Sequence, residues 1–247
     1  MKGLSLATLS IHADKSSSAD ISAPLHVSTT FKYPEGTNEI AAQKRGWITT
    51  DLQPTEHHVY SRMSTDTRDR LETVLGALEN GYAVTYSSGL ASIFALFEYF
   101  QPKTILMNKE GYHGSHHSIQ LYAKNRDVKI LYLEDGDYLG TLKKGDLPQN
   151  PRGEVSDLSY YSSKKPDGVI LAVDATFAPP PIQYTLEHGA DIVMHSSTKS
   201  LGGHSDLLGG VLITRDSKVR DELVVQRHFL GSVMGNMEAW LLLRSLR

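Results

Sequence analysis

The 247-residue sequence contains no cysteine, which excludes disulfide bonds, thiolate metal sites and a cysteine nucleophile. It has no run of about 18 apolar residues, so no transmembrane helix is expected. The net charge of −3 provides no basic surface for nucleic acid or for a membrane. The first residues contain only a short apolar stretch, which makes a poor signal peptide, so a cytoplasmic location is expected.

The most informative stretch begins with a short apolar run at 192–194, which predicts a buried strand. Three hydroxyl residues follow and lead directly to Lys199, and two glycines come next at 202–203. Burial of a lysine lowers its pKa, and a neutral amine is the form that condenses with a carbonyl group. We interpret Lys199 as a Schiff-base lysine, with the Ser196 and Thr198 hydroxyls as donors to a phosphate. The alternative is an exposed lysine in a polar turn.

A second apolar run, at 169–173, is nearly continuous and predicts a parallel strand that is buried on both faces. The run leads into Asp174, which therefore stands at the carboxyl end of the predicted strand. Open α/β sheets bind their ligands at the carboxyl ends of their strands. A carboxylate in this position suits a partner for a protonated pyridine nitrogen. The two runs together therefore favour a cofactor site over an ordinary polar turn.

A third motif, SSGLA at 87–91, stands between a predicted strand at 83–86 and a strongly apolar predicted helix that continues to Phe100. A turn of small residues at a helix N-terminus offers free amide donors and a favourable helix dipole to an anion. Ser88, Gly89 and Leu90 are therefore candidate phosphate ligands, although the same pattern is also an ordinary helix N-cap.

These motifs together resemble the Cys/Met-metabolism family of pyridoxal-phosphate enzymes, which comprises cystathionine lyases and synthases, sulfhydrylases and methionine γ-lyase. The signature GAD-x-x-x-HS-x-TK-x-x-GGHSD is matched from residue 189 to residue 206. The resemblance implies pyridoxal 5'-phosphate as cofactor and the type I fold of aspartate aminotransferase. That fold is α/β, with a mostly parallel seven-stranded sheet flanked by helices. A homodimer or homotetramer is implied as well.

The resemblance also assigns roles to individual residues. Lys199 would hold the cofactor and take the Cα proton of the substrate, Asp174 would keep the ring nitrogen protonated, and Tyr112 would stack on the ring and assist proton transfer. Tyr60 and Arg62 would reach the phosphate of the neighbouring subunit. The full set of implied cofactor contacts is Tyr60, Arg62, Ser88, Gly89, Leu90, Tyr112, Asn150, Asp174, Thr176, Ser196, Thr198 and Lys199.

The resemblance divides the chain into an arm over the partner subunit at 1–55 and a cofactor-binding large domain at 56–247. The small C-terminal domain of the family, with its arginine for the substrate carboxylate, is absent from this sequence. The family also has a short strand ending in E-[ST]-P before the position of Asn150, whereas here Leu147 passes directly into Pro148. Either the sheet has a shortened strand or a segment has been lost at this point, and we favour a lost segment, because a deletion inside a central parallel strand should be severely destabilising.

The reaction expected from the resemblance is C–S cleavage of cystathionine by β-elimination. The alternatives are γ-elimination, or γ-replacement as in γ-synthases and O-acylhomoserine sulfhydrylases. A further alternative, of another class, is a non-catalytic homologue or fragment that acts only as an oligomer partner. No metal is expected, because His113, His116 and His117 lack a supporting carboxylate pattern. The expected ligand is a small amino acid.

Overall fold

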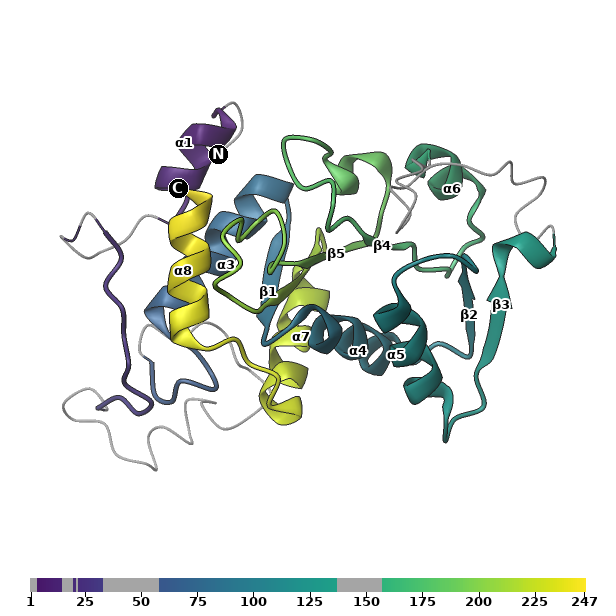
Figure 1. Ribbon diagram of the computed structural model, residues 1–247, viewed down its shortest axis with the longest axis horizontal. Coiled ribbons are helices and arrows are strands. Elements are labelled where there is room, and N and C mark those ends of the chain that lie inside the picture. The colour runs from purple at the N-terminus through teal and green to yellow at the C-terminus, as the bar shows by residue number, and fades with distance from the viewer. Residues whose placement is uncertain (1–3, 15–19, 21, 33–57, 137–156) are drawn as a thin grey trace.

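The computed structural model describes residues 4–14, 20, 22–32, 58–136 and 157–247 (Figure 1). Its helices are α1 (Leu6–His12), α3 (Asp66–Glu79), α4 (Gly89–Phe100), α5 (His113–Ala123), α6 (Leu158–Lys164), α7 (Ser217–Leu230) and α8 (Asn236–Leu246), with 3-10 turns η1 (Leu133–Asp135) and η2 (Thr185–His188). Its strands are β1 (Tyr82–Tyr86), β2 (Thr104–Met107), β3 (Lys129–Tyr132), β4 (Ala172–Asp174), β5 (Ile192–Ser196) and β6 (Gly210–Thr214). None of these helices is long and apolar enough to cross a membrane.

The strands form two separate sheets in the described part of the chain. The larger sheet has the order β1-β6-β5-β4, and β2 pairs with β3 as a parallel ribbon. The strand β6 runs antiparallel to both of its neighbours, whereas β4 and β5 are parallel. The expected seven-stranded, mostly parallel sheet is therefore not confirmed. The strand β6 lies in the middle of its sheet and is buried throughout.

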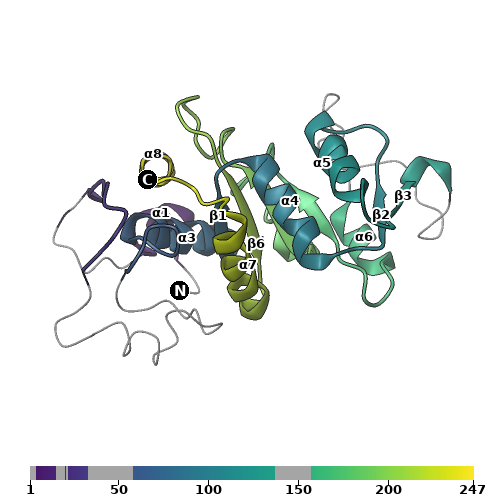
Figure 2. The same ribbon diagram turned by 90° about the horizontal axis from the view of Figure 1, so that it is seen from below.

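Helices cover both faces of the four-stranded sheet (Figures 1 and 2). Alternation along the strands sends Val193, Val211 and Ile213 to one face, where they pack with α1, α3 and α8. Residues Met194 and Leu212 point to the other face, against α4 and α7. The result is a three-layer α/β/α arrangement, in which each strand residue has a predictable side.

The strand predicted at 169–173 forms only in part. The ladder with β5 begins at Ala172, and the side chains of Val169 and Ile170 are 45% and 43% exposed. In the described part of the sheet β4 has a hydrogen-bonded neighbour on one side alone. An edge strand has less cover than a central one, which explains why the expected burial on both faces is not observed.

The expected extended arm at 1–55 contains a helix at its start. Ser5 caps α1 by accepting a hydrogen bond from the backbone N–H of Thr8, and the side chains of Leu6 and Leu9 pack against the core. Asp14, which follows the helix, forms a 2.6 Å ion pair with Arg70 of α3. This part of the segment therefore packs on its own chain, and contact with a partner subunit stays a prediction.

A buried charge cluster joins α3, β1 and α7. The Glu72 carboxylate accepts hydrogen bonds from the backbone N–H and the hydroxyl of Thr85, at 2.8 and 2.7 Å, and it also pairs with Arg227. Arg227 donates to the Thr85 carbonyl at 2.7 Å. Side chains thus satisfy both backbone groups of Thr85 on the open edge of β1. Burial alone raises the pKa of Glu72, but Arg227, Arg68 and the Thr85 donors outweigh it and lower that pKa.

Protonation of His228 should weaken the fold at acid pH. Burial lowers the pKa of His228 to about 4, assisted by Arg227, Arg68 and Arg62 and opposed by its hydrogen bond to the Met63 carbonyl. The neutral form is favoured in the folded state, so this stability is complete above the ordinary histidine pKa and is lost as the pH falls toward 4. We expect a loss of about 1 kcal/mol, reduced for solvent screening.

The measurement is urea unfolding at neutral pH and at about pH 5 for the wild type and for His228→Gln, which keeps a donor for the Met63 carbonyl but does not titrate. The wild type should lose more stability than the variant over this range. Equal losses in the two proteins would contradict the assignment.

Candidate active site

The candidate site lies at one edge of the four-stranded sheet. The carboxyl ends of β1, β4 and β5 meet there with the amino end of β6, because β6 is antiparallel to its neighbours. The register pairs Asp174 with Met194, and Gly210 with both Ser196 and Tyr86. Segments that are distant in the sequence therefore contribute their ends to one place, as expected for a ligand site of an α/β sheet.

Asp174 is exposed at this edge, and its carboxylate is held by the turn that follows β4. The hydroxyl of Thr176 donates to Asp174 Oδ1 at 2.5 Å, and the Thr176 backbone N–H donates to the same oxygen at 3.1 Å. The backbone N–H of Ser196 in turn donates to Thr176 Oγ1 at 2.8 Å. Buried Thr176 therefore ties the carboxylate to the end of β5, and this fixes its direction relative to Ser196.

The N-terminus of α4 lies against the same strand end. Ser88 caps the helix through a 3.1 Å hydrogen bond from the backbone N–H of Ala91. The N–H groups of Gly89 and Leu90 are in the first turn and have no acceptor within the helix. A Cβ atom at Gly89 would lie 3.2 Å from Ser196 Oγ. Glycine at this position therefore allows the helix terminus to lie close to the Ser196 hydroxyl. We call the first turn of α4 together with Ser196 the anion cradle, because free N–H groups at a helix N-terminus are typical donors to an anion.

Gly210, the first residue of β6, allows the N-terminus of α4 to lie close to that strand. A Cβ atom at Gly210 would overlap the Ser88 carbonyl oxygen and would lie 2.7 Å from Ser92 Oγ. We expect Gly210→Ala to displace the helix terminus, to reduce stability by about 1–3 kcal/mol, and to weaken anion binding. Denaturant unfolding and phosphate titration would measure the two effects. The matched control is Gly111→Ala, whose Cβ would meet only His116 Nε2, at 3.4 Å; a control as damaging as Gly210→Ala would contradict the steric argument.

Lys199 is in the turn directly after β5. Its backbone N–H donates to the Ser196 carbonyl at 3.1 Å, and its carbonyl accepts from Gly203 at 2.8 Å. Thr198 Oγ1 accepts from the Gly209 N–H at 3.2 Å, which holds that hydroxyl against the start of β6. The Lys199 side chain is exposed and has no polar partner among the described residues. The burial expected around this amine is thus not observed.

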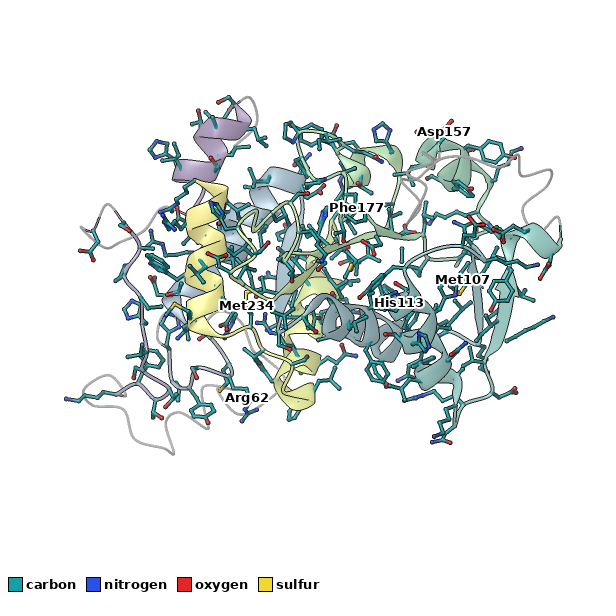
Figure 3. The ribbon with its side chains drawn as sticks, in the orientation of Figure 1. Arg62, Met107, His113, Asp157, Phe177 and Met234 are labelled. Atoms are coloured by element: carbon teal, nitrogen blue, oxygen red, sulfur yellow. The ribbon has the colours of Figure 1, made fainter. Side chains whose placement is uncertain are left out.

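Tyr112 stands at the start of α5 and is 40% exposed. A Cβ atom at Gly114 would overlap its ring and would lie 2.8 Å from Leu90 Cδ2. The ring of Tyr112 is therefore close to the Leu90 side chain in the first turn of α4. Its ring also contacts His113, at a centroid distance of 4.7 Å. Figure 3 labels His113 at the end of α5 that faces α4.

Two other predicted ligands lie elsewhere. Arg62 donates to the carbonyl of His228 at 3.0 Å, and its guanidinium lies 5.5 Å from the ring centre of Tyr60. Figure 3 shows Arg62 well separated from Phe177, which follows Thr176. The role of this pair in a neighbouring subunit stays a prediction. Asn150 lies outside the described residues.

Sequence reasoning missed a buried pair behind the site. His195 of β5 and Glu79 of α3 join through a 2.8 Å hydrogen bond and are 1% and 2% exposed. His195 is part of the signature around Lys199, but no role was assigned to it. The available signal was strand alternation, which directs His195 to the face opposite Ser196. Among the described residues, no group of histidines and acids could hold a metal ion.

The donor set suits a phosphorylated aromatic cofactor. Two free amides and the hydroxyls of Ser196 and Thr198 can bind a phosphate, and the ring of Tyr112, which lies near Leu90, offers a flat face for stacking. A fixed carboxylate at Asp174 and an amine at Lys199 complete a set typical of pyridoxal-phosphate proteins. The fold and the residues at this edge of the sheet are therefore typical of an α/β protein that binds pyridoxal phosphate.

Comparison with known proteins identifies the family. The family model described as "Cys/Met metabolism PLP-dependent enzyme" matches residues 7–247, so the chain belongs to that family. It is 31% identical to the cystathionine γ-lyase of Bacillus subtilis, covering 97% of this chain and 63% of the relative. It is 30% identical to the cystathionine β-lyase of Lactococcus lactis, covering 96% of this chain and 61% of the relative.

Solved structures give the same result. The cystathionine γ-lyase of Micromonospora echinospora matches with a TM-score of 0.82 and 29% identity, over 99% of this chain and 64% of that one. The yeast cystathionine γ-lyase matches with a TM-score of 0.81 and 29% identity, over 100% of this chain and 63% of that one. The chain spans about three fifths of the length of these relatives.

Proposed function

We propose that the protein is a pyridoxal-phosphate-dependent carbon–sulfur lyase of sulfur amino-acid metabolism that cleaves cystathionine by β-elimination. The observation that carries the proposal is the Asp174 carboxylate, fixed by Thr176 next to an anion cradle and the turn that bears Lys199. The balanced reaction converts cystathionine and water into homocysteine, pyruvate and ammonia. A cytoplasmic dimer or tetramer is part of the same proposal.

Each residue has a distinct task in this proposal. When bound, pyridoxal phosphate supplies an electron sink for a substrate that loses its Cα proton. The Lys199 amine removes that proton, and the Asp174 carboxylate keeps a proton on the ring nitrogen. Tyr112 would pack against the ring face and would assist proton transfer through its hydroxyl. The phosphate would be held by a set of backbone and side-chain donors: Ser88, Gly89, Leu90, Ser196 and Thr198, with Tyr60 and Arg62 of a neighbouring subunit.

The choice of β- over γ-elimination rests on two positions near Tyr112. His117 stands five residues after the tyrosine, where several γ-enzymes of the family carry an arginine. Gly114 stands where methionine γ-lyases carry a cysteine, and its Cβ would overlap the Tyr112 ring. A larger residue at 114 would therefore displace that ring, so the geometry here suits glycine. The named relatives include both β- and γ-enzymes and do not separate the two reactions.

Two measurements test the proposal. Borohydride treatment of the protein with pyridoxal phosphate, followed by peptide mapping, should place the reduced adduct on Lys199. Incubation with cystathionine should then release homocysteine and pyruvate. Release of cysteine and 2-oxobutyrate would assign γ-elimination instead. Absence of any adduct would favour the non-catalytic homologue, and it would overturn the proposed function.

A further inference from the structure

We infer that Glu79 and His195 are positioning residues for Asp174, acting from the opposite face of the sheet through the peptide bond between Ala175 and Thr176. The inference rests on the proposed function, because it gives Asp174 its role at the cofactor ring. His195 reaches the turn through Nδ1, which lies 3.0 Å from the Ala175 carbonyl oxygen. Its Nε2 lies 2.8 Å from Glu79 Oε1.

The protons of this pair follow from its partners. A carbonyl oxygen only accepts, so Nδ1 of His195 must carry a proton and donate it to Ala175. One further proton is shared between Nε2 and the Glu79 carboxyl group. The pair is therefore either an imidazolium with a carboxylate or a neutral imidazole with a carboxylic acid, and in both forms it is neutral overall. Because both side chains are almost completely buried, a net charge on the pair would be costly, and the pair must be neutral overall.

The peptide group that follows Ala175 connects the two faces. Its carbonyl oxygen accepts from His195, and its N–H, which belongs to Thr176, donates to Asp174 Oδ1 at 3.1 Å. Hydrogen bonds in such a chain polarise one another, so a strong donor at the carbonyl strengthens the N–H at the other end. Glu79 and His195 thereby reinforce the hydrogen bond that the Thr176 N–H makes to the Asp174 carboxylate.

The same contacts limit how the turn can move. Thr176 holds Asp174 from the α4 face of the sheet, and His195 holds the next carbonyl from the α3 face. The backbone N–H of Ala175 also donates to the Met194 carbonyl at 2.9 Å. Loss of His195 leaves the Ala175 carbonyl without its buried donor, and the carboxylate loses its fixed direction.

The test uses Glu79→Gln, which can donate to Nε2 and so fixes a neutral imidazole without removing the contact. A second variant, His195→Leu, removes the donor to Ala175, and His195→Gln restores a donor at this position. The matched control is Glu222→Gln on α7, because this carboxylate is 48% exposed and distant in the fold. The readouts are the amide proton signal of Thr176 in the cofactor-free chain and the affinity for pyridoxal phosphate.

We expect the Thr176 amide signal to move upfield in Glu79→Gln and further in His195→Leu, with partial recovery in His195→Gln. Affinity for pyridoxal phosphate should fall about tenfold. This value is the lower end of the range observed when a residue that orients a metal ligand is removed, and His195 orients Asp174 in a comparable way. Variants that match Glu222→Gln in both readouts, or that all fail to fold, would overturn the positioning role. The amide signal needs no cofactor, so it still tests this inference if the wild type binds no pyridoxal phosphate and the proposed function fails.

Discussion

Replacement of Lys199 by alanine should abolish covalent retention of pyridoxal phosphate and reduce turnover of cystathionine by at least about 10²–10⁴-fold. This range is the usual contribution of one positioned acid–base group, and the variant loses the attachment as well. Lys199→Arg should be equally inactive, because a guanidinium keeps its charge and cannot serve as a neutral amine. The measurements are the mass of the borohydride-treated protein and kcat on cystathionine.

The matched control is Lys218→Ala, which removes an 82% exposed lysine whose nearest carboxylate oxygen is 4.0 Å away. This variant should retain the adduct and the wild-type rate. A reduced adduct that persists in Lys199→Ala, on another lysine, would remove the central residue of the proposed function. An active Lys199→Arg protein would show that the amine is not the proton acceptor.

The fate of Lys199 also shows what the sequence can and cannot predict. The motif around it predicted a strand followed by a hydroxyl-rich turn, and both are present because local spacing determines them. The expected burial is not present, since exposure depends on every segment that packs around a side chain. A motif reports which chemistry a residue can perform, whereas its environment is a property of the assembled fold.

Other predictions succeeded or failed for the same reason. The apolar helix that was predicted to continue to Phe100 is confirmed as α4, because apolar spacing is a local property. The N-cap, which the sequence offered as the alternative reading of SSGLA, is present at Ser88. Strand order is a long-range property, so an apolar run at 211–214 could not show whether β6 is central or at an edge. The link from Asp174 to Ser196 through Thr176 was likewise hidden, because it joins two strands through one hydroxyl group.

Loss of the Glu72 charge should have the largest effect on stability. We expect Glu72→Gln to reduce the free energy of unfolding by about 3–5 kcal/mol, the usual cost of removing one partner of a buried ion pair. Arg227 is 1% exposed and would keep an uncompensated charge beside β1. Since a small domain is stable by only about 5–15 kcal/mol, the variant should be partly unfolded at modest urea concentrations.

The pH dependence of this loss follows from the lowered pKa of Glu72 in the folded state. Its contribution is complete above the ordinary glutamate pKa and disappears as the pH falls below it, so the two proteins should converge in acid. Unfolding curves at neutral pH and below pH 4 measure the difference, with Glu222→Gln as the exposed control. The double variant Glu72→Gln/Arg227→Met should lose less than the sum of its single variants, because the second change removes the charge that the first leaves unpaired. Additive losses would mean that the two side chains stabilise α3 and α7 independently, and that their ion pair does not hold the edge of β1.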